Sequence, residues 1–318
     1  MKRAFVFPGQ GSQAVGMGKS LAEAFVEARH LFEEIDDALS QHLTRLMFEG
    51  PESDLTLTEN AQPALLAVSM AAMRVIETQG GLEFSRDVAY VAGHSLGEYS
   101  ALAAARALSV ADAARLLKRR GRAMQEAVPV GEGAMAALLG LDVAAARAVA
   151  EEAATSETGT QEVCVVANDN APGQVVISGH SGAVERAIAI AGARGARRAI
   201  RLPVSAPFHS PLMAPAAEVM KEALDAVALR GPLVPLVANV IAEPARMPAE
   251  LKRLLIEQMT AMVRWRESVL FLRSEEVEEI VEIGAGRVLT GLTKRIAPEL
   301  KARSVATPAE AEALLKEL

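Results

Sequence analysis

The chain has 318 residues, of which 51% are hydrophobic and 23% charged, so it is long enough for a full-sized core and for two domains. A net charge of −7 and an aromatic content of only 3% argue against a general nucleic-acid binder. No apolar run approaches the roughly 18–20 residues that span a bilayer, and the single cysteine, Cys164, excludes an intramolecular disulfide, so we expect a cytoplasmic protein without a membrane segment.

The first 130 residues alternate between short apolar segments and longer helical patterns. We expect strands at 4–7 and 87–92, and helices at 20–46, 62–79 and 98–107. A further helix begins at Ser109, a good N-cap, with Asp112 in its first turn. This alternation predicts an α/β protein with a largely parallel sheet.

Residues 131–203 follow a different order. Strands are expected at 134–140, 162–167, 174–178 and 197–202, with helices at 142–154 and 181–194 and a turn-rich segment at 168–173. The order β-α-β-β-α-β is typical of a ferredoxin-like domain. We therefore predict a small domain, 131–203, inserted in a large one, 1–130 and 204–318. In the large domain the pattern resumes with helices at 211–226, 248–262 and 266–273, strands at 233–238 and 277–282, and a final strand and short helix.

A candidate nucleophile lies in Gly93-His94-Ser95-Leu96-Gly97. This G-x-S-x-G motif follows an apolar strand and opens a helix, which is the setting of a nucleophile elbow. The glycines permit the sharp turn that projects the Ser95 hydroxyl at the sheet end, near the positive end of the next helix. The alternative is a glycine-rich turn with an incidental serine.

A serine hydroxyl needs a base, and His209 is the best candidate among the five histidines. It lies in the segment 203–211, which contains three prolines that stiffen the loop, and Ser210 with Pro211 is a good N-cap pair for the next helix. His94 is expected on the opposite side of the elbow, as a packing or hydrogen-bonding residue rather than the base. No acid is identifiable as a third member, and a backbone carbonyl is the alternative.

Arg120 breaks the pattern of its helix. It falls on the apolar stripe between Leu117 and Met124, where a buried guanidinium needs an anion because its desolvation is costly. The partner is either an internal acid or a substrate carboxylate, which the planar fork of arginine fits. Gln258 similarly lies on the apolar face of its helix, where its amide must be hydrogen-bonded.

Taken together, these motifs resemble the malonyl-CoA:acyl carrier protein transacylase family of bacterial fatty acid synthesis over nearly the whole chain. The matching segments are 5–13, 93–98, Arg120-Gly121, 168–179, 203–209 and Gln258. Asp169, within one of these segments, has no role that we can assign. The resemblance implies an α/β-hydrolase-like large domain with a mostly parallel sheet, plus the ferredoxin-like insertion, with the active site between them.

The resemblance also implies roles for individual residues. Ser95 would attack, His209 would act as base and then acid, and the backbone carbonyl of Gln258 would orient the histidine. The backbone amides of Gln10 and Leu96 would form the oxyanion hole. Arg120 would hold the malonyl carboxylate, and the ring of Phe208 would crowd an α-methyl group, which favours malonyl over methylmalonyl.

The expected activity is therefore a ping-pong malonyl transfer from malonyl-CoA to holo acyl carrier protein, without a metal or bound cofactor. The rival hypotheses are an esterase or thioesterase that releases the acyl group to water, and a non-enzymatic scaffold with a relic elbow. Docking of an acidic carrier protein would involve one of two basic clusters, or these charges are simply solvated surface. The clusters are Arg194, Arg197, Arg198 and Arg201, and Lys294, Arg295 and Lys301.

Overall fold

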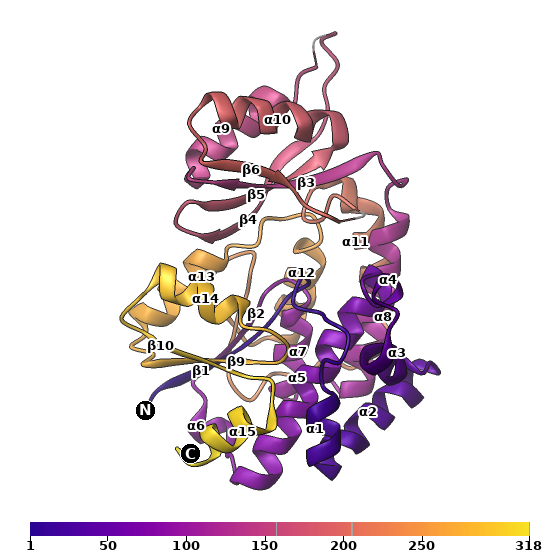
Figure 1. Ribbon diagram of the computed structural model, residues 1–318, viewed down its shortest axis with the longest axis vertical. Helices are drawn as coiled ribbons and strands as arrows, with labels where there is room; N and C mark the ends of the chain where they lie inside the picture. Colours follow the sequence, from indigo (N-terminus) through magenta and orange to yellow (C-terminus); the bar gives the residue numbers. More distant parts are fainter. Residues whose placement is uncertain (157, 205, 318) are drawn as a thin grey trace.

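The chain forms two β-sheets with helices around them, as the computed structural model in Figure 1 shows for residues 1–156, 158–204 and 206–317. The larger sheet has six strands in the order β10-β9-β1-β2-β7-β8. Its neighbouring strands are parallel except for β7 and β8. The strands are β1 Arg3–Phe7, β2 Tyr90–Gly93, β7 Leu236–Val237, β8 Pro244–Ala245, β9 Glu279–Ile283 and β10 Lys301–Val305. The predicted α/β class with a mostly parallel sheet is confirmed.

Strand β1 is buried on both faces. Its successive side chains point in opposite directions, so Phe5 and Phe7 join one core while Ala4 and Val6 join another. A parallel strand covered on both sides needs this continuous apolar sequence. The first core includes residues of helices α5 (Thr58–Gly80) and α7 (Gly97–Ala104), and the second includes residues of α13 (Trp265–Ser274) and α14 (Val288–Ile296).

The helices around the larger sheet come from both parts of the chain that flank the smaller sheet. They are α1 Lys19–Ala24, α2 Val26–Leu39, α3 Leu43–Glu49, α4 Glu52–Leu55, α5 Thr58–Gly80, α6 Phe84–Asp87, α7 Gly97–Ala104, α8 Val110–Glu126, the 3₁₀ turn η1 Pro211–Met213, α11 Ala214–Asp225, α12 Pro248–Glu257, α13 Trp265–Ser274, α14 Val288–Ile296 and α15 Pro308–Leu315. In the part of the chain that the structure describes, no helix is long and apolar enough to cross a membrane.

The smaller sheet is antiparallel, with the order β4-β5-β3-β6. Its strands are β3 Gly133–Leu139, β4 Cys164–Ala171, β5 Gln174–His180 and β6 Arg198–Arg201, and its helices are α9 Val143–Ala153 and α10 Ser181–Ala193. Figure 1 shows α9 and α10 on the side away from the larger sheet, while β4 faces it. The β-α-β-β-α-β order predicted from the sequence is confirmed.

Two local predictions are wrong. The helix expected at 20–46 is three helices, because Phe25 is extended and Ser40 adopts a left-handed conformation with φ 48°. The turn expected at 168–173 is shorter, since Asn168 to Ala171 belong to β4 and the turn itself contains only Pro172 and Gly173. Register shifts between β4 and β5 accommodate these turn-forming residues within a strand.

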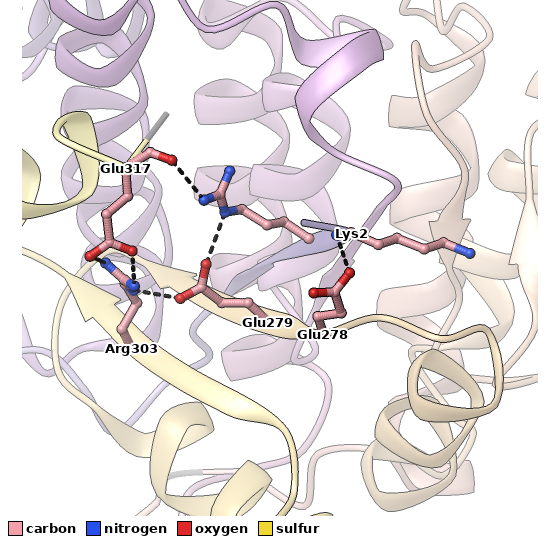
Figure 2. A network of polar contacts seen from close by, with 6 residues as sticks. Lys2, Glu278, Glu279, Arg303 and Glu317 are labelled. Carbon is pink, nitrogen blue, oxygen red and sulfur yellow. Dashed lines mark hydrogen bonds and ion pairs between the residues drawn. The ribbon is translucent and has the colours of Figure 1, made fainter.

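Both chain ends are tied to one edge of the larger sheet by a network of ion pairs (Figure 2). The buried carboxylate of Glu279 accepts hydrogen bonds from Arg3 over 2.9 Å and from Arg303 over 2.7 Å. Arg303 also donates to the Glu317 carboxylate over 3.0 Å, and Arg3 donates to the Glu317 carbonyl oxygen over 3.0 Å. A buried carboxylate requires such partners, so this network fixes β1, β9, β10 and the end of the chain together.

Candidate active site

Three loops meet at the carboxyl edge of the larger sheet. Strands β1 and β2 pair with Phe7 opposite Gly93, and β2 and β7 pair with Ala92 opposite Val237. Because the strands are parallel, the residues that follow each of them lie at the same edge, which is where ligand sites form in α/β sheets. This edge carries the segments after residues 7, 93 and 237.

Ser95 occupies a tight turn between β2 and α7, as predicted. Its φ of 52° lies in the left-handed region, which costs a residue with a side chain about 1–3 kcal/mol. A Cβ on Gly93 would lie 1.9 Å from the carbonyl carbon of Gly97, and one on Gly97 would lie 2.2 Å from the carbonyl oxygen of Phe7. Glycine is therefore required on both sides of the serine, and the turn points the hydroxyl away from the sheet.

The predicted base lies next to the predicted nucleophile. Ser95 Oγ and His209 Nε2 are 2.8 Å apart, and His209 Nδ1 is 2.8 Å from the backbone carbonyl oxygen of Gln258. Burial, and then the positive charge of Arg120, lower the pKa of His209 to about 3. The imidazole is therefore neutral, with Nδ1–H donating to the carbonyl and Nε2 free to accept from the serine.

The loop before η1 carries His209 in a left-handed conformation, with φ 56°. Ser210 is at the N-cap position, but its hydroxyl donates to the Pro207 carbonyl oxygen over 2.8 Å instead of capping the helix, so that detail of the prediction is wrong. This bond closes the turn around the histidine. Ser205, part of the loop considered in the sequence analysis, lies outside the described residues.

Arg120 is only 1% exposed, and its guanidinium points to the same place. Nη2 donates to Ser95 Oγ over 3.1 Å and to Gln258 Oε1 over 2.9 Å, while Nη1 donates to Gln62 Oε1 over 2.9 Å. Nε has no hydrogen-bond partner among the described residues. All of its direct partners are neutral, and burial lowers the pKa of the guanidinium.

The alternative of an internal acid as the direct partner of Arg120 is not met within the described ranges. The other basic residues of α8 each have a carboxylate within 4.0 Å: Arg115 with Asp112, Lys118 and Arg122 with Glu59, and Arg119 with Glu222. No carboxylate in the described part of the chain lies this close to Arg120. The site therefore holds a buried cation beside a serine hydroxyl with no carboxylate in direct contact, although the Glu98 carboxyl is near enough to act on its charge.

Gln258 is fully buried at the C-terminal end of α12, as its place on the apolar face predicted. Its Nε2 donates to the Ser95 carbonyl oxygen over 3.0 Å and to Glu98 Oε2 over 2.5 Å. Burial raises the pKa of Glu98 to about 8, although bonds from Asn239 and Gln258 and the charge of Arg120 act in the opposite direction.

Sequence reasoning missed Glu98, Asn239 and Gln62. Glu98 is the one charged residue in the alanine-rich segment that forms α7, and that composition is the only sequence signal for it; the structure shows that all eight residues of the helix are buried. Asn239 is the one polar residue in the otherwise apolar run 236–242. It lies two residues after the end of β7. Gln62 lies on the long apolar helix α5, where a buried amide also needs partners.

The remaining predicted residues lie around this centre. The backbone N–H groups of Gln10 and Leu96 follow β1 and the elbow serine, and neither donates a hydrogen bond to another described residue. Leu96 is also the N-cap residue of α7, at the positive end of that helix. Phe208 is 9% exposed and is part of the larger core next to His209 in the chain. His94, as expected, makes a hydrogen bond elsewhere, with Asn170 Oδ1 at 2.8 Å.

A serine and a neutral histidine in hydrogen-bond contact at a strand–turn–helix elbow can carry an acyl group as an ester. The family model described as "Acyl transferase domain" matches residues 4–309, and the chain therefore belongs to the acyl transferase family.

Relatives narrow this assignment. The chain is 48% identical to the malonyl CoA-acyl carrier protein transacylase of Bacillus subtilis (strain 168), covering 100% of this chain and 97% of that protein. A crystal structure of the acyl-carrier-protein-S-malonyltransferase from Bartonella henselae is 55% identical, with a TM-score of 0.96 over 100% of this chain and 99% of that one. Within the acyl transferases, the chain belongs to the malonyl CoA-acyl carrier protein transacylases.

One further solved structure contains a carrier protein. It is a malonyl-transacylase in complex with a holo type II PKS acyl-carrier protein. The matched chain of that complex is 41% identical to this one, with a TM-score of 0.94, and the match covers 100% of both chains.

Proposed function

We propose that this chain transfers the malonyl group of malonyl-CoA to the phosphopantetheine thiol of acyl carrier protein through an ester on Ser95, in fatty acid biosynthesis. The names and full-length similarity of its relatives support the reaction. The observation that supports the residue roles is the position of the Ser95 hydroxyl, which contacts the His209 imidazole on one side and the Arg120 guanidinium on the other.

In the first half-reaction His209 Nε2 takes the hydroxyl proton while Ser95 Oγ attacks the thioester carbonyl carbon. The carbonyl of Gln258 holds the tautomer that leaves Nε2 unprotonated, and it stabilises the imidazolium that forms. The tetrahedral oxyanion accepts hydrogen bonds from the backbone N–H groups of Gln10 and Leu96, which have no other acceptor among the described residues. The intermediate then collapses, the C–S bond breaks, and His209 gives its proton to the departing CoA sulfur.

The second half-reaction reverses these steps with a different thiol. His209 takes the proton of the phosphopantetheine thiol, the thiolate attacks the Ser95 ester, and the serine oxygen leaves with the proton from the imidazolium. The malonyl group stays on Ser95 after CoA has left and before the carrier thiol reacts, and this covalent intermediate gives ping-pong kinetics. No step in this scheme needs a metal or a bound cofactor.

Arg120 provides selectivity for a free carboxylate on the acyl group. Before substrate binds, the Arg120 guanidinium donates to the neutral amide oxygens of Gln62 and Gln258. A malonyl carboxylate can then become its negatively charged partner. An acetyl group leaves that cation unpaired in a buried pocket, and loss of one partner of such a pair costs roughly 2–5 kcal/mol.

Phe208 restricts the acyl group further. The ring is buried in the segment that carries His209, and a bulky group there crowds an α-methyl substituent. We therefore expect malonyl-CoA to be used in preference to methylmalonyl-CoA, and replacement of the ring by alanine to narrow that preference.

The two sheets correspond to the two proposed domains. We assign residues 1–130 and 204–318 to an α/β-hydrolase-like catalytic domain, and 131–203 to a ferredoxin-like domain, which the β4-β5-β3-β6 order supports. We place the reaction in the cytoplasm, with malonyl-CoA and acyl carrier protein as partners and no role for nucleic acid or a membrane.

Of the basic residues considered for carrier docking, several already have partners. Arg194 pairs with Glu152 and Arg201 with Glu185, whereas Arg295 donates to Gln174. These contacts favour a solvated-surface role for much of the first cluster. Lys294 and Lys301 remain the better docking candidates, since both line an open groove of about 920 Å³ beside β10.

Intact-protein mass spectrometry after incubation with malonyl-CoA tests the proposal. We expect a malonyl adduct on the wild type, its absence in Ser95→Ala, and its discharge on addition of holo carrier protein. An adduct that persists in Ser95→Ala would place the nucleophile elsewhere. Rapid loss of the adduct to water, without any thiol acceptor, would support a thioesterase instead.

A further inference from the structure

One asparagine side chain spans the nucleophile turn. Asn239, fully buried just after β7, donates from Nδ2 to the Gly93 carbonyl oxygen over 2.7 Å. Its Oδ1 accepts from the backbone N–H of Ser95 over 2.8 Å. These two bonds attach the last residue of β2 and the serine itself to the loop that follows β7. They hold Ser95 in a left-handed conformation that a serine does not adopt freely.

A buried carboxyl group holds that asparagine in turn. Glu98, three residues after Ser95 and 1% exposed, accepts from the backbone N–H of Asn239 at Oε1 over 2.6 Å. Its second oxygen accepts from Gln258 Nε2 over 2.5 Å. The carboxyl group thus joins the loop after β7 to the end of α12.

Gln258 extends this connection to the other two reacting groups. Its backbone oxygen contacts His209 Nδ1, and its side-chain Oε1 accepts from Arg120 over 2.9 Å. The serine, the histidine and the arginine therefore all depend on one buried chain of contacts, Asn239–Glu98–Gln258. Within the described residues, neither Asn239 nor Glu98 makes a side-chain hydrogen bond with the Ser95 hydroxyl itself.

From these contacts we infer that Asn239 and Glu98 are positioning residues of the acyl transfer. Asn239 keeps the Ser95 alcohol at the elbow, and Glu98 holds Gln258 so that His209 and Arg120 both face that alcohol. The inference rests on the proposed function for its reaction, but its geometry concerns only the reactivity of Ser95. Misplacing a reacting group by about 1 Å can lower a rate on the order of 100-fold.

The two residues should affect different properties. Asn239→Ala removes both bonds across the turn and a long contact of 3.4 Å with Gln258 Nε2, but it leaves Gln258 bonded to Glu98 and to Arg120. Ser95 should then react more slowly with every acyl donor, while the ratio of malonyl to acetyl transfer stays near that of the wild type. Glu98→Gln preserves size but places an NH₂ group against N–H donors. Gln258 then loses its anchor, and both the rate and the malonyl preference should fall.

The experiment measures two rates on purified, folded variants. The first is malonyl-ester formation by rapid quench and mass spectrometry. The second is labelling of Ser95 by a fluorophosphonate, which needs the serine and histidine but no carboxylate on the probe. We expect Asn239→Ala to lower both rates by about 10- to 100-fold, with the dissociation constant for malonyl-CoA changed less than threefold, about 0.7 kcal/mol.

Asn60→Ala is the matched control. Asn60 is also a buried amide with several hydrogen bonds, but its partners are Gln41, Lys118 and the Asp54 carbonyl, away from the serine turn. The Asn60→Ala variant should be less stable, but each folded molecule should form the malonyl ester and react with the fluorophosphonate at the wild-type rates. If Asn239→Ala does not fold, Asn239→Asp replaces it. Aspartate preserves the size of the side chain but cannot donate to the Gly93 carbonyl oxygen, so both rates should again fall.

Wild-type rates in folded Asn239 and Glu98 variants, or an equal fall in Asn60→Ala, would overturn the inference. Failure of the proposed function has a different signature, namely a wild type that reacts with the fluorophosphonate at Ser95 but forms no malonyl ester.

Discussion

The guanidinium of Arg120 donates to the hydroxyl oxygen of Ser95 over 3.1 Å, so the cation and the nucleophile are in contact before any substrate binds. A malonyl group has its free carboxylate only one carbon away from the thioester carbonyl. The short separation of the two protein groups suits an acyl group of this length. Longer diacids would have to bend or displace the arginine.

The first prediction concerns acyl selectivity. Replacement Arg120→Met removes the cation while keeping an apolar stem, so the transfer of malonyl relative to acetyl should fall by about 30-fold or more. Competition between the two CoA esters, read as the ratio of acyl-serine adducts, measures this directly. Arg122→Met is the control, because Arg122 is exposed on the same helix and pairs with Glu59. An unchanged ratio in Arg120→Met would remove the carboxylate-binding role.

The second prediction concerns the pKa of His209. Burial and the charge of Arg120 both disfavour the imidazolium, which places the pKa of His209 near 3. The base should therefore stay neutral well below the ordinary histidine pKa of about 6.5. Removing a nearby positive charge favours the imidazolium, so Arg120→Met should raise the pKa of His209. An NMR titration of the imidazole in both proteins tests the sign.

The same reasoning applies to the bound acyl group. A malonyl carboxylate beside Arg120 neutralises part of the charge that depresses the pKa of His209, which makes the histidine a stronger base only when the correct acyl group is present. Malonate added to the wild type should shift the titration upward, whereas acetate at the same ionic strength should not. Equal shifts with both anions would contradict this coupling.

The third prediction uses two glycines inside helices. A Cβ on Gly121 would lie 2.5 Å from the Thr58 carbonyl oxygen, so this glycine lets α8 approach the start of α5 and places Arg120 beside Gln62. Gly121→Ala should destabilise the protein by about 1–3 kcal/mol. Gly291, in α14, has open space at the Cβ position, and Gly291→Ala should stabilise by about 0.5–1 kcal/mol. Thermal melts of the two variants should move in opposite directions.

Much of this site could be predicted because local sequence determines it. The elbow glycines, the proline-rich histidine loop and the arginine on an apolar stripe each have a signature within a few residues, and the structure brings Ser95, His209 and Arg120 together. Glu98 and Asn239 were missed because their roles depend on β7 lying next to β2 in the sheet, which the order of elements along the chain does not reveal. The carbonyl of Gln258 has no side-chain signature at all, and only the family resemblance indicated it.

The fold shows the same division. Most of the order of strands and helices was predictable from apolar periodicity. Ser109 was predicted as the N-cap of α8 from its residue type, and the structure confirms it, since the Ser109 side chain accepts from the Asp112 backbone N–H. Helix α14, Val288–Ile296, was missed, since it begins after a glycine-rich segment and its first turn is held by the carboxylate of Glu282 on the preceding strand β9. Breaks such as Ser40 depend on packing of the flanking helices against α5, which sequence periodicity does not encode.

The last prediction gives Asp169 a role. This aspartate of β4 is 1% exposed, and Arg266 of α13 donates to both of its carboxylate oxygens, with Nε at 2.8 Å from Oδ2. The backbone N–H of Asp169 also donates to the Val263 carbonyl oxygen over 2.9 Å, so this segment joins the smaller sheet to the helices of the larger one.

Arg266→Met would leave the buried carboxylate of Asp169 unpaired. Removing one partner of a fully buried pair costs about 3–5 kcal/mol, and because the Arg266 side chain is 31% exposed we expect about 1–3 kcal/mol here. Arg253→Met, which breaks an exposed pair with Glu257 on α12, should cost less than about 1 kcal/mol. Urea unfolding midpoints of the two variants provide the comparison. Equal midpoints would mean that the Asp169–Arg266 pair does not hold the two sheets together, and that the backbone bonds between β4 and Val263 suffice.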